Sequence, residues 1–450
     1  MNTPSLEAIR DCFDGEIPSA VATCSTDGIP NVSYVSQVHY VDTTHVALTY
    51  QFFNKTRQNI LVNPAVCLLV ANPVTAARYQ IRAQYLRTEQ TGPVFENMKA
   101  KLSGIASHTG MSGVFRLQGA DIYRVETIDV IVEPSLPSPA KPSLLTALRN
   151  CTQAIQQFTD LEGLLTGALT SIERNFGTRH SMIHWLDESA ERLYLVASRG
   201  YAQSGVGSEI QMGHGVIGTA ASARTSIRIT HATSEYTYSR AARESVRDTH
   251  LADRLEAEIP LAGLERPGSQ LAVPITSRGQ LLGVLCLEAN EESRFGYDEE
   301  DAMVAFAQHL GLAAQLLEQA GEKQEEHPRK ASDPAKSSSP PDGKPLAIRH
   351  YTMDDTVFVD DDYLIKGVAG AILWKLLSEY TAHGRVDFTN RELRLDAGLP
   401  LPDLSSNLEA RLILLQRRLT ERCPHIGIVK TGRGRFRLRI DRPVHLLEVS

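Results

Sequence analysis

Residues 270–288 read QLAVPITSRGQLLGVLCLE, and this stretch indicates how the middle of the chain folds. Two apolar runs, 270–275 and 280–288, flank Ser277-Arg-Gly279. Short apolar runs on either side of a glycine-containing turn are typical of paired, buried strands. We therefore predict a β-hairpin inside an α/β domain. Cys286 falls in the second strand, where we expect a buried structural thiol rather than an exposed redox switch.

Helical patterns flank this hairpin. Apolar residues recur at three- and four-residue spacing in 144–176, and Asp298-Glu-Glu-Asp301 opens a final helix that we expect to end near residue 319. Strands are predicted at 180–186 and 193–198. Gly213-His-Gly-Val-Ile-Gly218 fits the G-x-G-x-x-G spacing, but it lacks the βαβ context and the acid ~20 residues downstream that a dinucleotide loop needs. We therefore predict no dinucleotide site here.

Five segments within residues 145–320 together resemble a GAF domain. They are Ser198-Arg-Gly200, Gly213-His-Gly-Val-Ile-Gly218, Leu271-Ala-Val-Pro-Ile275, Gly279-Gln-Leu-Leu-Gly-Val-Leu285 and Phe295-Gly-Tyr-Asp-Glu-Glu-Asp301. The resemblance implies an α/β (α+β) sensor domain that binds a small-molecule effector and dimerises through its terminal helices. A structural GAF domain without a ligand stays open as an alternative.

The histidines and cysteines of this unit do not identify the effector. Its histidines are His180, His184, His214, His231 and His250. No pair has metal-ligand spacing on one predicted helix, so we expect core or surface histidines and no metal site. No cysteine lies between Cys151 and Cys286, which leaves no evident bilin attachment. The six cysteines of the chain form no C-x-x-C pair, and we expect reduced thiols.

Two stretches divide the chain. Residues 321–345, GEKQEEHPRKASDPAKSSSPPDGKP, contain almost no large apolar side chain and are predicted to be a disordered linker. Residues 133–142 contain four prolines and mark a weaker boundary. The predicted units are therefore 1–132, 143–320 and 346–450.

The first unit is mostly β in pattern. Residues 17–90 contain several β-rich runs, and Asp27-Gly28 is a strong hairpin signal. Asn54-Lys55-Thr56-Arg57 then opens a helix directly after a strand. Free N–H groups at a helix start, together with Lys and Thr donors, suit a phosphate group. The same residues at a helix start are also common as solvated or capping residues.

The order strand, hairpin, strand, FFNKTRQNILVNP (52–64) and apolar strand resembles the pyridoxamine 5′-phosphate oxidase-like β split barrel over residues 15–127. The resemblance implies FMN binding and a homodimer. It implies a flavin site formed by Ser33, Ser36, Thr49, Tyr50, Lys55, Thr56 and Gln80, with Lys55 and Thr56 at the phosphate. The family's Arg-Lys phosphate pair is Lys55-Thr56 here, and its basic substrate residues have no match. Binding of haem or a deazaflavin, and loss of the ligand, stay open.

Basic residues concentrate near the C-terminus. Residues 403–442 contain ten Lys and Arg and four Asp and Glu, a local charge of +6 in a chain whose net charge is −7. Such a patch is typical of a protein that binds a polyanion, although a solvated surface can look the same.

Three predicted helices, 369–380, 387–395 and 407–422, precede a hairpin at 426–440. Residues 352–440 resemble the winged helix-turn-helix output domain of response regulators. The resemblance implies DNA binding, with the third helix in the major groove and the wing on the backbone or minor groove. The implied contacts are Ser406, Asn407, Arg411, Arg417 and Arg418 on the helix and Arg433 and Arg435 on the wing.

One feature of the third helix departs from that family. Ile413 and Leu414 lie on the face opposite the buried stripe, where relatives carry polar residues. An apolar pair there can contact thymine methyl groups, dock a protein or form a dimer.

Together these patterns predict a multidomain protein made of a β split barrel, a GAF domain and a C-terminal winged helix-turn-helix. The predicted function is a ligand- or redox-responsive transcriptional regulator, homodimeric and cytoplasmic, that binds DNA. No apolar run approaches the ~18–20 residues of a membrane helix, and the start lacks the pattern of a secretory signal. The alternative is an FMN-dependent oxidoreductase with a regulatory GAF domain and a protein-docking C-terminal domain.

Overall fold

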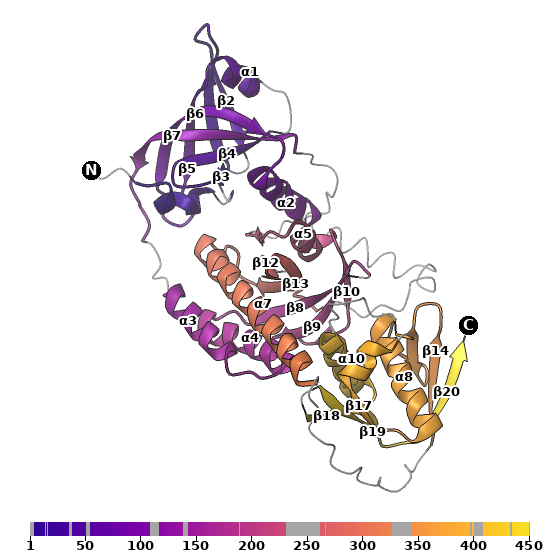
Figure 1. Cartoon of the computed structure of the whole chain (residues 1–450). Helices are drawn as coiled ribbons and strands as arrows, with labels where there is room; N and C mark the ends of the chain where they lie inside the picture. The colour runs from indigo at the N-terminus through magenta and orange to yellow at the C-terminus, as the bar shows by residue number, and fades with distance from the viewer. Residues whose placement is uncertain are drawn as a thin grey trace.

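The computed structural model describes residues 4–449 apart from 14, 16, 36–37, 51–54, 109–116, 138–142, 189, 231–261, 266, 326–343, 397, 400–407 and 433. The described residues form three units that follow one another in space in their sequence order. The N-terminal unit lies at the top of Figure 1, the central domain in the middle and the C-terminal unit at the lower right.

The N-terminal unit is an antiparallel sheet around an apolar interior. Its strands are β1 (Ser19–Cys24), β2 (Pro30–Val35), β3 (Val38–Tyr40), β4 (His45–Tyr50), β5 (Ala65–Ala71), β6 (Arg78–Glu89) and β7 (Gly119–Val132), in the order β2-β1-β5-β6-β7-β4-β3. A 3₁₀ helix (Glu7–Phe13) and two α-helices, α1 (Lys55–Val62) and α2 (Pro93–His108), accompany the sheet. The predicted Asp27-Gly28 hairpin joins β1 to β2, with Gly28 at φ +79°.

Strand alternation separates the interior of this unit from its outer surface. Val21, Leu68 and Ile81 lie in one row across β1, β5 and β6, and none of the three is exposed. The adjacent row contains Tyr34 and Leu69, which are 82% and 42% exposed. Since successive strand residues point to opposite faces, the register fixes which side chains share the interior.

The central domain is a six-stranded antiparallel sheet between two helical layers. The sheet order is β10-β9-β8-β13-β12-β11, formed by β8 (His180–Asp187), β9 (Arg192–Arg199), β10 (Glu209–Gln211), β11 (Ile227–Ile229), β12 (Ser269–Ser277) and β13 (Gln280–Ala289). Helices α3 (Leu144–Ile155), α4 (Leu161–Phe176) and α7 (Tyr297–Glu325) share one apolar core with the sheet, and α5 (Gly215–Ala223) packs in a second core on the other face. Figure 1 shows α3, α4 and α7 side by side.

The predicted hairpin at 270–288 is confirmed as β12 and β13. The turn has positive φ at Arg278 and Gly279, 50° and 80°. Gly283 permits close approach to β8, because a Cβ there would lie 2.1 Å from the carbonyl oxygen of His184. The final helix, α7, continues to Glu325, beyond the predicted end near residue 319 and into the predicted linker. The rest of that linker, up to residue 343, lies outside the described residues.

The C-terminal unit begins with strands that the sequence patterns missed. β14 (Leu346–Tyr351), β15 (Thr356–Val359), β16 (Asp362–Ile365) and β20 (Val444–Val449) form a sheet in the order β16-β15-β14-β20. Three helices, α8 (Gly367–His383), α9 (Asn390–Leu395) and α10 (Leu408–Arg422), follow the first three strands. A second sheet, β17-β19-β18, is formed by β17 (Asp387–Thr389), β18 (Ile426–Gly432) and β19 (Arg435–Ile440). The predicted capping box of Thr389 and Glu392 is present at the start of α9.

Buried charges connect the N-terminal unit to the central domain. The carboxylate of Glu300 on α7 lies 3.1 Å from Arg228 Nε and 3.6 Å from Lys101 Nζ of α2. These neighbouring charges hold the pKa of Glu300 at about 2 although the residue is buried. At the same boundary, Arg10 donates to Asp301 at 2.9 Å. The two units therefore meet through one buried charge cluster around Glu300 and one more exposed ion pair between Arg10 and Asp301.

Candidate functional site

The predicted phosphate segment opens α1 and lies against β2. The Oγ1 atom of Thr56 lies 2.9 Å from Ser33 Oγ and accepts a hydrogen bond from Asn31 Nδ2 at 3.0 Å. Lys55, the first residue of α1, is exposed. The first turn of α1 contains no acidic residue, so the positive end of the helix dipole is not neutralised there. The structure thus brings Ser33 and Thr56 into contact, with Lys55 next to Thr56 in the first turn of α1.

The neighbouring Arg57 has an internal partner. Its Nη1 atom donates to Thr88 Oγ1 at 2.9 Å and forms an ion pair with Asp121, which is 5% exposed. On the same helix, Asn59 donates to Thr23 Oγ1 at 3.1 Å. These bonds anchor α1 to the sheet, and they leave Lys55 as the exposed cation of the segment.

The other predicted flavin residues do not join this cluster within one chain. Gln80 pairs with Leu69 in the register, on the outer face of the sheet, whereas Ser33 lies in the row of Val21 and Ile81. Thr49 pairs with the buried Ala120, which packs with residues of α2. Ser36 lies outside the described residues, as does the side chain of Tyr50. A single site that contains both Ser33 and Gln80 is therefore not formed by one face of this sheet.

A buried carboxyl group lies on the α5 face of the central sheet. Glu288 of β13 is 5% exposed and accepts hydrogen bonds from the backbone N–H of Leu264 (2.9 Å), Gln270 Nε2 (3.0 Å) and Tyr201 Oη (3.1 Å). Burial raises the pKa of Glu288 and, two residues earlier, that of Cys286. Sequence reasoning missed Glu288; the available signal was an acid at the end of an otherwise apolar strand.

The histidines match the expectation of core and surface positions where they are described. His184 is completely buried, with no hydrogen-bond partner at either ring nitrogen among the described residues, and burial lowers its pKa to about 3. His214 is exposed before α5, and His180 is half-buried beside Tyr201. His231 and His250 lie outside the described residues. Within the described part of the chain, no three His, Cys, Asp or Glu residues form a group that could hold a metal ion.

The third predicted helix of the C-terminal unit, α10, is covered on both of its apolar faces. Its predicted stripe of Leu408, Leu412, Leu415 and Leu419 packs in the core of its own unit. On the opposite face, Ala410 and Ile413 pack in the core of the central domain, beside α4 and α7. Of the apolar pair that the sequence singles out, Ile413 therefore packs against another domain of the same chain, whereas Leu414 packs in the core of the C-terminal unit.

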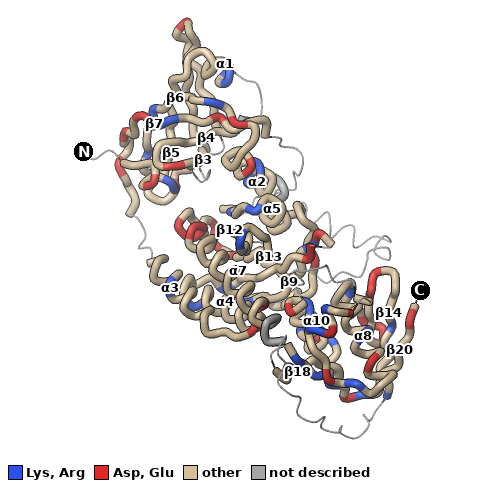
Figure 2. Tube along the Cα trace, in the orientation of Figure 1, with Lys and Arg blue, Asp and Glu red and all other residues tan. Residues whose placement is uncertain are grey.

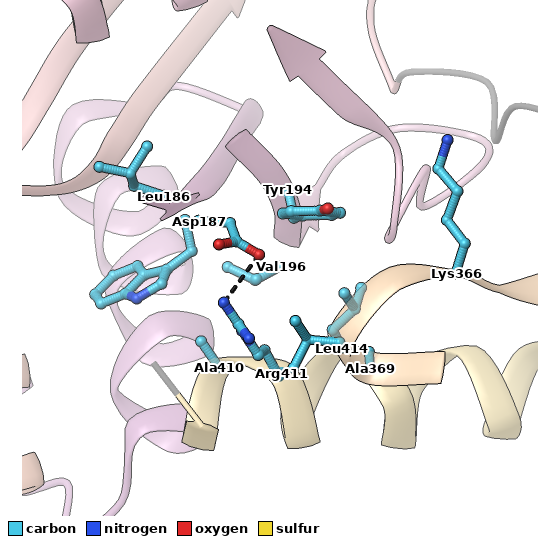
Figure 3. Close-up of a pocket in the computed structure, with 11 residues that line it drawn as sticks. Leu186, Asp187, Tyr194, Val196, Lys366, Ala369, Ala410, Arg411 and Leu414 are labelled. Carbon is cyan, nitrogen blue, oxygen red and sulfur yellow. Dashed lines mark ion pairs between the residues drawn. The ribbon is translucent and has the colours of Figure 1, made fainter. Parts of the chain in front are cut away.

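An ion pair accompanies this apolar contact. Arg411 Nη2 of α10 lies 2.9 Å from Asp187 Oδ2 at the end of β8, and both residues are less than a tenth exposed. The pair lines a cavity of about 20 Å³, to which Trp185, Tyr194 and Leu414 also contribute. Figure 3 shows the Arg411 guanidinium pointing toward the Asp187 carboxylate. Burial lowers the pKa of Arg411, and the Asp187 carboxylate opposes this effect.

The remaining residues predicted to contact DNA form hydrogen bonds within the chain, are exposed, or lie outside the described residues. Arg417 donates to the carbonyl oxygen of Val196 (2.6 Å) and to Thr166 Oγ1 (2.7 Å), both in the central domain. Arg418 donates to the carbonyl oxygen of Leu364 at 3.0 Å. In this structure Arg411, Arg417 and Arg418 each have an internal acceptor, and their contact with DNA stays a prediction. Arg435 is exposed on β19, while Ser406, Asn407 and Arg433 lie outside the described residues.

Comparison with known families bears on the first two units. A family model described as pyridoxamine 5′-phosphate oxidase matches residues 5–125, and a GAF domain model matches residues 160–314. The chain carries a pyridoxamine 5′-phosphate oxidase-type domain followed by a GAF domain. The predictions of a multidomain chain, of a split-barrel-like first unit and of a GAF domain are confirmed by these matches. The GAF match places α4, α5 and most of α7 in one domain with the central sheet.

Solved structures resemble each of the two domains separately. The GAF domain of an Acinetobacter phosphoenolpyruvate-protein phosphotransferase is 22% identical and covers 40% of this chain and 97% of its own, with a TM-score of 0.32. Free methionine-R-sulfoxide reductase from Neisseria meningitidis is 18% identical over 41% of this chain and 98% of its own, with a TM-score of 0.31. An FMN-binding protein from Syntrophomonas wolfei is 15% identical over 28% of this chain and 86% of its own, with a TM-score of 0.25.

A curated relative covers only a short stretch. An uncharacterized protein of Methanocaldococcus jannaschii is 43% identical over 54 residues, which are 12% of this chain and 36% of the relative's length. Separately, none of the helices in the described part of the chain combines the length and apolar character that crossing a bilayer requires.

Proposed function

We propose that the protein is a ligand-responsive transcriptional regulator in which a flavin-type split barrel and a GAF domain act on a DNA-binding C-terminal unit. The observation that carries the proposal is the order of elements in that unit, combined with its local charge of +6 between residues 403 and 442. Lys and Arg gather on α10 and around the β18–β19 hairpin in Figure 2.

The order of elements supports a winged helix-turn-helix. A sheet of three antiparallel strands precedes α8, and a short strand and α9 precede α10, which is followed by the basic hairpin β18–β19. In such a unit, α10 is the helix that enters a major groove and the hairpin is the wing. Arg435 is exposed on the wing, where it is available to a phosphate.

The barrel is the proposed flavin-binding module. Exposed Lys55 and the hydroxyl groups of Ser33 and Thr56 lie at the positive end of α1, an arrangement that suits a phosphate monoester such as that of FMN. The family match and the resemblance to an FMN-binding protein are in accord with this cofactor. When bound, FMN would supply one- or two-electron redox chemistry, and Lys55, Thr56 and Ser33 would orient its phosphate.

A GAF domain provides a site for a small-molecule effector, and we place that site on the α5 face beside Glu288. The side chains of Glu288, Gln270 and Tyr201 are polar groups on a face that is otherwise lined by apolar residues. A few fixed polar groups among apolar side chains are typical of small-molecule sites.

We further propose a homodimer formed by the barrel. Its outer surface exposes Val32 (66%), Tyr34 (82%) and Leu61 (52%), together with Val62 and Leu69. Apolar side chains of this size that are exposed on one small unit favour burial against a second copy.

The experiment that tests the proposal has two parts on the purified full chain. Absorption spectroscopy, with mass spectrometry of whatever dissociates on heating, identifies the cofactor. Gel shift with duplex DNA at low ionic strength tests the regulator. Rapid NAD(P)H oxidation by the flavin-loaded protein, with no duplex binding under any condition, would overturn the regulator proposal. The alternative, an FMN-dependent oxidoreductase, would then be favoured.

A further inference from the structure

The helix that the proposed function assigns to DNA is mostly buried in this structure. Of its fifteen residues, nine are buried, and they are Leu408, Ala410, Arg411, Leu412, Ile413, Leu414, Leu415, Arg418 and Leu419. A recognition helix must present one face to base edges in the major groove. With one face against its own unit and the other against the GAF domain, α10 has no such face open.

The GAF surface that covers α10 is apolar at its centre. Ala410 and Ile413, both 3% exposed, share a core with Leu161, Leu165 and Leu317 of α4 and α7. This explains why Ile413 stands where a DNA-reading helix would be expected to carry a polar residue. Its burial favours docking onto the GAF domain by the hydrophobic effect.

Carboxylates of the GAF domain pair with cations of the C-terminal unit around this centre. Asp187 pairs with Arg411 at 2.9 Å, Asp160 with Lys430 at 3.1 Å, and Glu162 lies 3.5 Å from Lys430 and 4.0 Å from Arg417. Lys430 lies on β18, in the proposed wing. The acidic side chains thus contact helix and wing together, the two elements that would contact DNA phosphates.

The contact is incompletely packed. A cavity of about 70 Å³ lies between α10, the β18–β19 hairpin and the start of α4, and is lined by Asp160, Ile413, Lys430 and Phe436 among others. The smaller cavity beside Arg411 lies in the same contact. Side chains that line such gaps lack some of the dispersion contacts of a well-packed core. The two units should therefore separate at a lower free-energy cost than unfolding the core of either unit.

We propose that the GAF domain and duplex DNA compete for the same surface of the C-terminal unit, so that this structure is the closed form that excludes DNA. The proposal rests on the proposed function. Binding to mutually exclusive forms is linked: anything that favours the open form raises the affinity for DNA, and DNA favours opening by the same factor. An effector on the GAF domain would act by changing the stability of this contact.

The test opens the contact from the GAF side only, so that no proposed DNA contact is altered. The variant is Asp160→Asn/Glu162→Gln/Asp187→Asn in the full chain. Asn keeps the hydrogen bond by which Asp160 caps α4, since Asn and Asp are equally good N-caps. The matched control, Glu126→Gln/Asp129→Asn/Glu133→Gln, removes the same negative charge from exposed positions on and just after β7.

Two readouts are needed, binding to a random-sequence duplex at low ionic strength and the radius of gyration from small-angle scattering. We expect the GAF-side variant to bind the duplex about tenfold more tightly than the control, which corresponds to a coupling of ~1.4 kcal/mol, and to have a larger radius of gyration. Equal DNA affinity and equal size for the two variants would overturn the closed-form proposal. If the variant opens but binds no DNA, DNA is not the partner of this surface. The contact between the GAF domain and the C-terminal unit in the wild-type protein would still be supported.

Discussion

Asp187, the last residue of β8 in the GAF domain, and Arg411, in the first turns of α10, are joined by a 2.9 Å ion pair across the boundary between two units. They are 5% and 7% exposed. Breaking a buried pair by removing one partner leaves the other charge desolvated and uncompensated. The pair therefore makes the docking of α10 specific, because an uncharged or misplaced side chain at either position would not satisfy it.

A double-mutant cycle measures this relationship. We expect Asp187→Ala and Arg411→Ala to destabilise the docked arrangement by about 3 kcal/mol each, because each removes an ion pair between two desolvated charges. The double variant should lose clearly less than the sum of the two. Urea denaturation of the three proteins, monitored by a probe on the C-terminal unit, gives the coupling. Strictly additive losses would show that the two side chains do not depend on one another.

Glu300, at the boundary between the barrel and the GAF domain, should make the stability of the protein depend on pH. The pKa of Glu300 is held at about 2 by Lys101 and Arg228, well below its usual value of 4.5. Its contribution is therefore fully present above pH ~4.5 and is lost as the pH falls toward 2. We expect Glu300→Gln to lower the thermal midpoint at pH 7 and to differ less from the wild type at pH 3. Asp298→Asn, at an exposed position of the same helix, is the control and should change neither midpoint.

His184 predicts a different pH profile. Because burial lowers its pKa to about 3, the folded protein binds fewer protons than the unfolded chain below pH 6.5. Stability from this group is complete above pH 6.5 and falls by at most ~1.4 kcal/mol per pH unit below it. His184→Leu should flatten the decline in thermal midpoint between pH 6.5 and 4. A decline of unchanged slope in the variant would assign the acid sensitivity to other groups.

The proposed flavin site can be tested with two ligands. Lys55→Ala should weaken FMN binding about tenfold by removing a cation from the phosphate, while riboflavin, which has no phosphate, should bind the variant and the wild type alike. Gln80→Ala should leave both affinities within about twofold if the site lies at Ser33 and Thr56 of one chain. Fluorescence titration measures all six affinities, two ligands for each of the three proteins. An equal loss for both ligands in Lys55→Ala would place the residue away from the phosphate.

Local patterns predicted much of the fold. The hairpin at 270–288 and the capping box at Thr389 depend on residues that are close in sequence, and both are present in the structure. In the missed sheet of the C-terminal unit, β14, β15 and β16 pair with their neighbours in sequence, but β20 pairs in parallel with β14, whose residues lie about a hundred positions earlier. No short-range signal specifies such a pairing.

The site was predicted less completely, and for the same reason. Gln80 and Ser33 were assigned to one flavin site, but the register across β2, β1, β5 and β6 places them on opposite faces. Ile413 was recognised as an apolar residue in an unusual place, yet its partners on α4 and α7 belong to another domain. Glu288 and Asp187 are not among the predicted site residues, because burial at a strand end is set by what packs over it rather than by neighbouring residues.

Binding of duplex DNA by the full chain, measured against salt concentration, tests the regulator account most directly. The protein to use is the opened variant Asp160→Asn/Glu162→Gln/Asp187→Asn, with and without the added pair Arg433→Ala/Arg435→Ala in the wing. The account predicts binding that weakens steeply as salt rises, because counterions are released from the phosphates, and a weaker affinity with a shallower salt slope when the wing arginines are removed. Absence of binding at low ionic strength, or binding that the wing variants leave unchanged, would contradict it.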